Sequence, residues 1–314
     1  MPEPRTPAEQ QGQQEALRNR VGISTISFRQ RELDEALEVI AGLGAVDVDL
    51  GAIPAVVDHI PVPYAGEPAT VAGTLAGHGL HAGAVNADLG DFNDPALSAA
   101  DLAEVARPLI RLAAASGGAL IVPAGRASWE PFVDVEEDLA CLVANLERLA
   151  ALCAEQDVRL LVEVLHHRRF VHSVERAQAV LDALGQETAG LLFDVSHIVA
   201  SAEDPVAWLR RCAARVERVH LRDAVPGDLN LGIGRGQVDF PGVIGALEDT
   251  GYSGGYILEL ETHDVAEADR EADAADARRR ILAILAEHAS PDSRDAASGT
   301  VGGTTPASVQ EGSL

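Results

Sequence analysis

The feature of this sequence that most constrains its fold is a regular alternation between short apolar runs and longer amphipathic segments. The apolar runs are typical of parallel strands that are covered on both faces. Between them, apolar residues recur at three- and four-residue spacing, which predicts helices. Eight strands are predicted, over residues 21–28, 45–50, 80–87, 119–124, 158–165, 190–195, 215–221 and 255–260.

Signals at the ends of the predicted helices support this pattern. Asp134 can cap a helix whose capping box Glu137 closes, and another helix runs from Ser173 to a stop at Gly185. Eight strand–helix units in about 270 residues favour an α/β fold, a single closed (β/α)8 TIM barrel. A doubly wound open sheet is the alternative, but the first strand leads into SFRQRE rather than a GxGxxG turn.

Both ends of the chain differ in composition from this middle region. Residues 1–20 and 289–314 contain few large apolar side chains. Such segments bury too little surface to offset the entropy of ordering, so we expect disordered tails around a barrel domain at 21–288. Deleting both tails should then change the melting temperature by no more than about a degree or two.

Charge and cysteine content limit the partners and the compartment. The chain has 24 Lys and Arg against 49 Asp and Glu, a formal net charge of −25, which disfavours nucleic acid and membrane surfaces as partners. It contains no apolar stretch of about eighteen residues and no secretory signal. The three cysteines, Cys141, Cys153 and Cys212, are too few and too scattered for a disulfide framework. These features predict a cytoplasmic protein and leave its oligomeric state open, a homo-oligomer included.

The last four predicted strands each end in a side chain that can bind a metal. These are Glu163, Asp194, His220 and Glu259, with Glu261 as a second candidate on the last strand. The active site of a TIM barrel lies at this end of the strands. Buried carboxylates close together repel one another unless a cation lies among them. Three carboxylates and one imidazole suit a single Mn²⁺, Mg²⁺ or Co²⁺ ion, and Zn²⁺ or Fe²⁺ less well.

Several motifs together carry a resemblance to a known family. In chain order they are GISTISF, LLVEV, LLFDVSH, VHLRD, GRGQVDF and YILELE. This series resembles the sugar phosphate isomerase/epimerase family of xylose-isomerase-like TIM barrels, from about Val21 to His288. The resemblance implies that Glu163, Asp194, His220 and Glu259 bind one divalent metal. It also implies that the two glutamates act as acid and base catalysts.

The chemistry of such a site is understandable from its parts. A metal that holds the carbonyl and adjacent hydroxyl of a ketose stabilises the enediolate formed when the neighbouring C–H is deprotonated. Two carboxylates on opposite sides can then invert the carbon, or return the proton to the other carbon. We therefore expect a metal-dependent isomerase or epimerase of a ketose-type sugar or sugar derivative.

Other functions remain open on the same residues. One is a lyase that dehydrates a keto-inositol or cleaves a keto-glycoside, since the first proton abstraction is shared. Another is a non-catalytic barrel subunit. An endonuclease is least favoured, because the chain is acidic and lacks the extra histidines of a three-metal site.

Further residues are candidates for contact with the small-molecule sugar substrate. His197 follows Asp194 by three residues, and by resemblance it touches substrate or lies beside the metal. Arg235, in the GRGQVDF loop, could hold a hydroxyl, carboxylate or phosphate, or its loop could simply lead to a helix cap at Asp239. The remaining candidates are His166 beyond Glu163, Asn86 and Asp49 at the barrel top, and Trp129, Phe132 and Tyr64, which could instead be loop packing.

Overall fold

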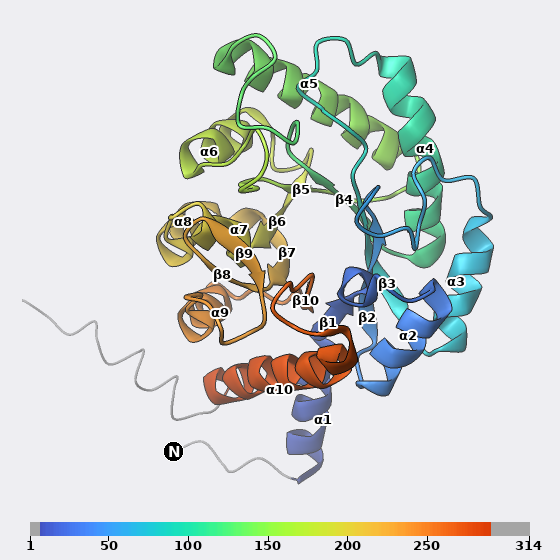
Figure 1. Cartoon of the computed structure of the whole chain (residues 1–314), viewed down its shortest axis with the longest axis vertical. Coiled ribbons are helices and arrows are strands. Elements are labelled where there is room, and N and C mark those ends of the chain that lie inside the picture. The colour runs from blue at the N-terminus through green and yellow to red at the C-terminus, as the bar shows by residue number, and fades with distance from the viewer. Residues whose placement is uncertain (1–6, 290–314) are drawn as a thin grey trace, which may run out of the picture.

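The chain folds as a closed barrel of eight parallel strands surrounded by helices (Figure 1). The computed structural model describes residues 7–289. Around the barrel the strand order is β1-β10-β7-β6-β5-β4-β3-β2, which confirms the predicted TIM barrel. The strands are β1 Val21–Ser24, β2 Asp47–Ala52, β3 His81–Ala87, β4 Ala119–Pro123, β5 Leu160–Glu163, β6 Gly190–Asp194, β7 Val216–Leu221 and β10 Gly255–Leu258.

Helices follow the strands and pack around the outside of the barrel (Figure 1). The predicted cap at Asp134 is present, because its side chain accepts a hydrogen bond from the Glu137 amide at 2.9 Å. Ser173 likewise caps the helix that begins at Val174. The helices are α2 Leu33–Gly42, α3 Pro68–Gly77, α4 Ala99–Ser116, α5 Val135–Ala154, α6 Val174–Ala183, α7 Val195–Ala200, α8 Pro205–Cys212, α9 Phe240–Asp249 and α10 Arg270–His288, with 3-10 turns at Thr25–Phe28, Ala213–Arg215 and Glu267–Asp269.

The N-terminal segment differs from its prediction. Residues 7–19, expected to be disordered, form helix α1 (Pro7–Asn19) beside α10 (Figure 1). Leu17 packs against the hydrophobic core, and the Arg278 guanidinium donates to the Arg18 carbonyl at 2.9 Å. These tertiary contacts order a segment whose own composition is polar. Residues 290–314 of the predicted C-terminal tail lie outside the described residues.

A short hairpin after β7 was not predicted. It consists of β8 (Asp223–Val225) and the antiparallel β9 (Asp228–Leu231). The buried Asp223 carboxylate accepts four backbone N–H groups, from Ala224, Gly234, Gly236 and Val238. This carboxylate therefore anchors the glycine-rich loop to the end of β7.

Strand alternation explains why polar side chains collect at one end of the barrel interior. Leu161 and Leu192 belong to a small buried apolar cluster contributed by β3, β4, β5 and β6. Two residues further along the same strand faces stand Glu163 and Asp194. The inward positions thus change from apolar to carboxylate at the carboxyl end of the strands. Among the described residues, no helix is long and apolar enough to cross a membrane, and all three cysteines are free thiols.

Candidate active site

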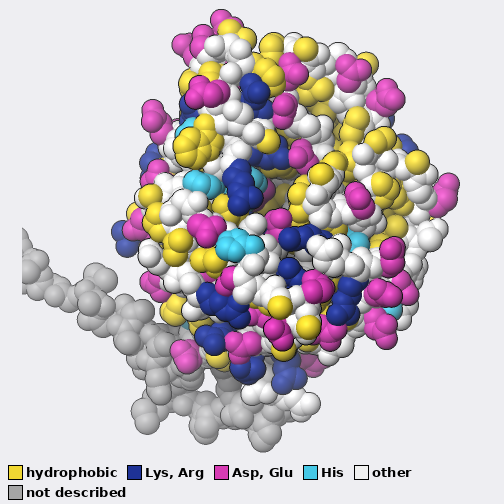
Figure 2. Space-filling view, in the orientation of Figure 1, with side chains coloured by type: hydrophobic (Ala, Val, Ile, Leu, Met, Phe, Trp, Pro, Cys, Tyr) yellow, Lys and Arg dark blue, Asp and Glu magenta, His cyan; other side chains and the backbone are white. Residues whose placement is uncertain are grey.

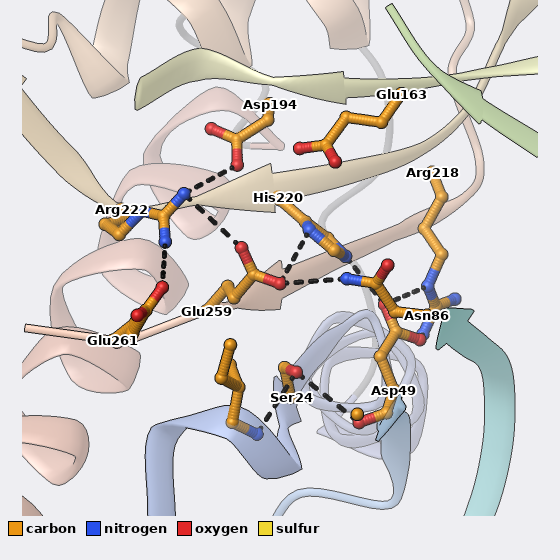
Figure 3. A network of polar contacts seen from close by, with 12 residues as sticks. Ser24, Asp49, Asn86, Glu163, Asp194, Arg218, His220, Arg222, Glu259 and Glu261 are labelled. Carbon is orange, nitrogen blue, oxygen red and sulfur yellow. Dashed lines mark hydrogen bonds and ion pairs between the residues drawn. The ribbon is translucent and has the colours of Figure 1, made fainter. Parts of the chain in front are cut away.

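The four predicted ligands lie together at the carboxyl end of the barrel (Figure 3). Glu163 ends β5, Asp194 ends β6, His220 lies near the end of β7, and Glu259 directly follows β10. One ligand atom from each of the first three lies within 4.8 Å of the others. The Glu259 Oε1 atom lies 3.4 Å from His220 Nδ1. All four side chains are buried, so solvent screens their charges weakly.

The His220 ring presents one nitrogen to this cluster. Its Nε2 atom lies 2.7 Å from the Asp49 Oδ2 atom, which occupies that side of the ring. Its buried Nδ1 atom makes no hydrogen bond to any described residue. The Glu259 carboxylate pairs with it at 3.4 Å, and a bound metal ion would take the place of this pairing. The ring nitrogen and the surrounding oxygens therefore fit a metal-binding site.

The charges in the cluster are incompletely balanced. Burial, together with the nearby carboxylates of Asp194 and Glu259, raises the pKa of Glu163 to about 8. Burial by itself would lower the pKa of His220, but Glu259 and Asp49 outweigh burial and raise it well above its ordinary value. The site thus takes up positive charge, as a proton or as a cation.

Arg222 is a site residue that the sequence analysis missed. Its buried guanidinium lies 3.2 Å from Asp194 Oδ2 and 3.4 Å from Glu259 Oε2. The residue is part of the VHLRD motif and continues the inward alternation of Arg218 and His220, which is the signal that could have identified it. It neutralises part of the carboxylate charge and also lines the pocket above the cluster.

Glu261, the second candidate on the last strand, lies in different surroundings. Its carboxylate oxygens are each 3.5 Å from an arginine, Arg29 on one side and Arg222 on the other. Its side chain is also more exposed than that of Glu259. The position next to His220 belongs to Glu259.

A cavity of about 290 Å³ opens above these residues. Figure 2 shows this face of the molecule hollowed near its centre, with histidine, basic and acidic side chains around the hollow. The residues that line the cavity include Glu163 and Glu259 together with Asn86, His166, His197 and Arg222. Three of the four predicted substrate-binding residues therefore border the cavity.

His197 and His166 form a stacked pair in this wall, with ring centroids 3.7 Å apart. Burial, followed by nearby positive groups, lowers the pKa of each ring well below its ordinary value, so both are neutral. The His197 Nδ1 atom accepts the His167 amide at 3.2 Å. The His197 Nε2 atom lies 3.2 Å from the NH2 atom of Arg222, which can only donate, and 3.6 Å from Glu163 Oε1.

Asn86 and Arg235 differ in their placement. Asn86 donates to Glu259 Oε1 at 3.0 Å and so orients one of the predicted catalytic carboxylates. Arg235 does not border the cavity, because its half-exposed guanidinium pairs with Asp264 and Asp273. The structure instead shows the cap at Asp239, which was the alternative interpretation of this loop.

The aromatic candidates also lie away from the cavity. Trp129 is 51% exposed and stacks on His172, with ring centroids 4.8 Å apart. Phe132 lies under the Arg126 guanidinium, and Tyr64 is buried in the main core. Loop packing, the alternative considered for these residues, describes their contacts.

Sequence comparisons connect this architecture to characterised proteins. The family model of the xylose isomerase-like TIM barrel matches residues 37–284. An inosose dehydratase of Clostridium perfringens is 30% identical over 153 residues, which cover 40% of this chain and 48% of the relative. The rhizopine catabolism protein MocC of Rhizobium meliloti is 36% identical over 137 residues, 37% of this chain and 41% of the relative. The chain thus spans about half the length of the curated relatives it matches.

Solved structures show the same fold at low sequence identity. An L-ribulose 3-epimerase superposes with a TM-score of 0.69 at 16% identity, covering 92% of this chain and 100% of that chain. The IOLI protein with a bound zinc atom has a TM-score of 0.70 at 16% identity, covering 84% and 98%. A 3-keto-D-glucoside 4-epimerase of E. coli, YcjR, has a TM-score of 0.65 at 14% identity, covering 83% and 99%. Because the family model matches most of its residues, the chain belongs to the xylose isomerase-like TIM barrel family.

Proposed function

We propose that the protein is a divalent-metal-dependent isomerase or epimerase of a ketose-type sugar or sugar derivative. The observation that carries this proposal is the convergence of three buried carboxylates and the Nδ1 atom of His220 beneath a cavity. Arg222 compensates only part of the negative charge, since the pKa of Glu163 is still raised to about 8. A divalent cation would complete the balance.

Glu163, Asp194, His220 and Glu259 would hold the ion. A donor set of mainly carboxylate oxygens suits Mn²⁺, Mg²⁺ or Co²⁺. The zinc atom in the structurally similar IOLI protein supports a divalent ion at such a site without deciding which one. When bound, the ion would supply the positive charge that stabilises the oxyanion of a deprotonated sugar.

Glu163 and Glu259 are the proposed proton carriers. They come from β5 and from the end of β10, and both border the cavity. A carboxylate on each side of a bound sugar can remove a proton from one face and return it to the other, which inverts the carbon. The hydrogen bond from Asn86 holds the Glu259 carboxylate in orientation for this transfer.

The neutral histidines and Arg222 are the proposed substrate contacts. The His197 ring and the Arg222 guanidinium, whose Nε2 and NH2 atoms lie 3.2 Å apart, both border the cavity, and the guanidinium can donate to a carbonyl or hydroxyl oxygen of the sugar. His166 stacks on His197 and borders the same cavity. Such polar side chains match a substrate rich in hydroxyl and carbonyl oxygens.

A lyase is the second candidate, and the curated relatives favour it. The matched Clostridium proteins are inosose dehydratases, which by name remove water from a keto-inositol. Proton abstraction beside the carbonyl is the first step of both reactions. The two candidates differ in the second step, which is proton return in an isomerase and loss of a β-hydroxyl group in a dehydratase.

Deuterium exchange tests the proposal. Protein stripped of metal and reloaded with Mn²⁺, Mg²⁺ or Co²⁺ is incubated in D₂O with a panel of ketoses and keto-inositols, and the products are analysed by NMR. Deuterium beside the carbonyl with a new epimer or aldose supports the isomerase, and an unsaturated product supports the lyase. If the metal-loaded protein exchanges no proton in any substrate, the proposal fails and the non-catalytic barrel is the interpretation that remains.

Two substitutions identify the proton carriers. Glu163→Gln and Glu259→Gln keep an oxygen at each position but remove the base, so each should slow exchange by about 10²–10⁴-fold. Glu261→Gln is the matched control, because Glu261 borders the same cavity but pairs with Arg29 and Arg222. Near-wild-type exchange in both test variants would contradict the two-glutamate mechanism.

A further inference from the structure

A row of buried, charged side chains crosses the barrel interior from β2 to β7 and ends at His220 (Figure 3). The Oδ2 atom of Asp49, on β2, lies within hydrogen-bond distance of the His220 Nε2 atom, at 2.7 Å. The same carboxylate is paired with Arg218 of β7, which lies two residues before His220. Asp49 and His220 are completely buried, and Arg218 is 7% exposed.

The Asp49 contact decides which ring nitrogen of His220 faces the carboxylate cluster. A carboxylate accepts hydrogen bonds, so the Nε2 atom beside it must carry a proton. When the ring is neutral, its lone pair is therefore on Nδ1, which faces the site and lies 3.4 Å from Glu259 Oε1. A histidine that ligates a metal needs its second nitrogen held in this way.

We propose that Asp49 is a positioning residue that fixes the orientation and tautomer of His220 for metal binding. This inference rests on the proposed function, because it assigns Asp49 a role toward the proposed ion. Asp49 itself does not border the cavity, so it acts through His220 rather than on the substrate.

Arg218 holds the Asp49 carboxylate in place. Its Nε atom donates to Asp49 Oδ2 at 3.0 Å, and its NH2 atom lies 2.6 Å from Asp49 Oδ1. The guanidinium also donates to Asp47 Oδ1 at 2.9 Å. Both oxygens of Asp49 are therefore engaged, and rotation of the carboxylate away from His220 would break these contacts.

Gly83 in the neighbouring strand β3 leaves room for the Arg218 guanidinium and the Asp47 carboxylate that pairs with it. A Cβ atom at Gly83 of β3 would overlap both the Arg218 guanidinium and the Asp47 carboxylate. An alanine there would force the arginine to move without touching His220 or the ligand carboxylates. Gly83→Ala therefore disturbs the contacts between Arg218 and Asp49 indirectly.

The alternative is that Asp49 serves only as a counter-ion for Arg218. Asp47 separates the two roles, because it pairs with the same guanidinium but its hydrogen bonds and ion pairs do not include His220. If the counter-ion role were the whole explanation, Asp47→Asn and Asp49→Asn should have similar effects. A positioning role predicts that only Asp49→Asn, and more weakly Gly83→Ala, impairs metal binding.

The experiment measures metal affinity of the full chain with Mn²⁺ and Co²⁺ by chelator competition. Asp49→Asn should weaken binding by about 10–100-fold, and Asp47→Asn by less than about threefold. The Co²⁺ absorption spectrum should change in Asp49→Asn and stay the same in Asp47→Asn. Equal affinities of the wild type and Asp49→Asn, or equal losses in both aspartate variants, would overturn the inference.

A measurement on the wild type covers the case in which Asp49→Asn does not fold. In protein labelled with ¹⁵N-histidine and loaded with diamagnetic Zn²⁺, His220 should show a proton-bearing Nε2 and a metal-shifted Nδ1. A metal-shifted Nε2 would overturn the role of Asp49 while leaving the metal site intact. If the wild type binds no ion at all, the proposed function fails, and this inference fails with it.

Discussion

The titration of Glu163 should make the metal-free protein less stable as the pH rises. In the unfolded chain this glutamate titrates at its ordinary pKa of 4.5, whereas in the fold burial and the nearby carboxylates raise the pKa to about 8. The folded state therefore holds the proton more tightly than the unfolded state. The stabilisation is fully present below about pH 4.5 and is lost as the pH rises through about 8.

The size of the effect is set by these two values. Over the interval between them, stability falls by about 1.4 kcal/mol per pH unit. At pH 7 the accumulated loss is about 3 kcal/mol, which corresponds to roughly 6–12 °C in melting temperature for a domain of this size. Glu163→Gln removes the titrating group and should remove this part of the slope.

Urea denaturation in the presence of a chelator tests the prediction. The free energy of unfolding is measured for the wild type and Glu163→Gln at several pH values between 5 and 8.5, with Glu261→Gln as control. The difference between the wild type and Glu163→Gln should change by about 4 kcal/mol over this range, while the control follows the wild type. Parallel curves for Glu163→Gln and the wild type would refute the reasoning. Added Mn²⁺ should reverse the trend, because the ion binds the ionised carboxylate.

Three further predictions concern other parts of the molecule. Asp138→Ala should lower the free energy of unfolding in urea titrations by about 2–4 kcal/mol, because the Asp138 carboxylate accepts hydrogen bonds from two backbone amides and from the Asn93 side chain. The control Asp134→Ala removes only a helix cap and should lower it by about 1 kcal/mol. Deleting residues 1–19 should lower the melting temperature by several degrees through loss of the α1 contacts with α10 and the core, so an unchanged value would speak against them. Arg235→Ala should leave kcat/KM within about twofold of wild type, since its guanidinium pairs with surface carboxylates; a large loss would place it at the substrate.

Local sequence patterns were sufficient for the barrel and for the position of the four proposed ligands. An apolar run between amphipathic helices predicts a parallel strand, and parallel strands in a barrel bring their carboxyl ends to one edge. The period of two along a strand then places Glu163 and Asp194 on the same inward face as Leu161 and Leu192. These rules need only neighbours in sequence, so no tertiary contact had to be known.

The partners of those ligands depended on closure of the barrel. Asp49 and His220 are 171 residues apart, and nothing in either strand indicates that their side chains meet at 2.7 Å. Arg222 and Arg235 stand in adjacent motifs, yet only strand direction and the loop anchor at Asp223 place one inside the site and the other on the surface. Helix α1 is similar, because its polar composition predicts disorder and only packing against α10 orders it. Sequence pattern determined which strands form and which way their side chains face, whereas contacts between distant segments exist only once the chain has closed on itself.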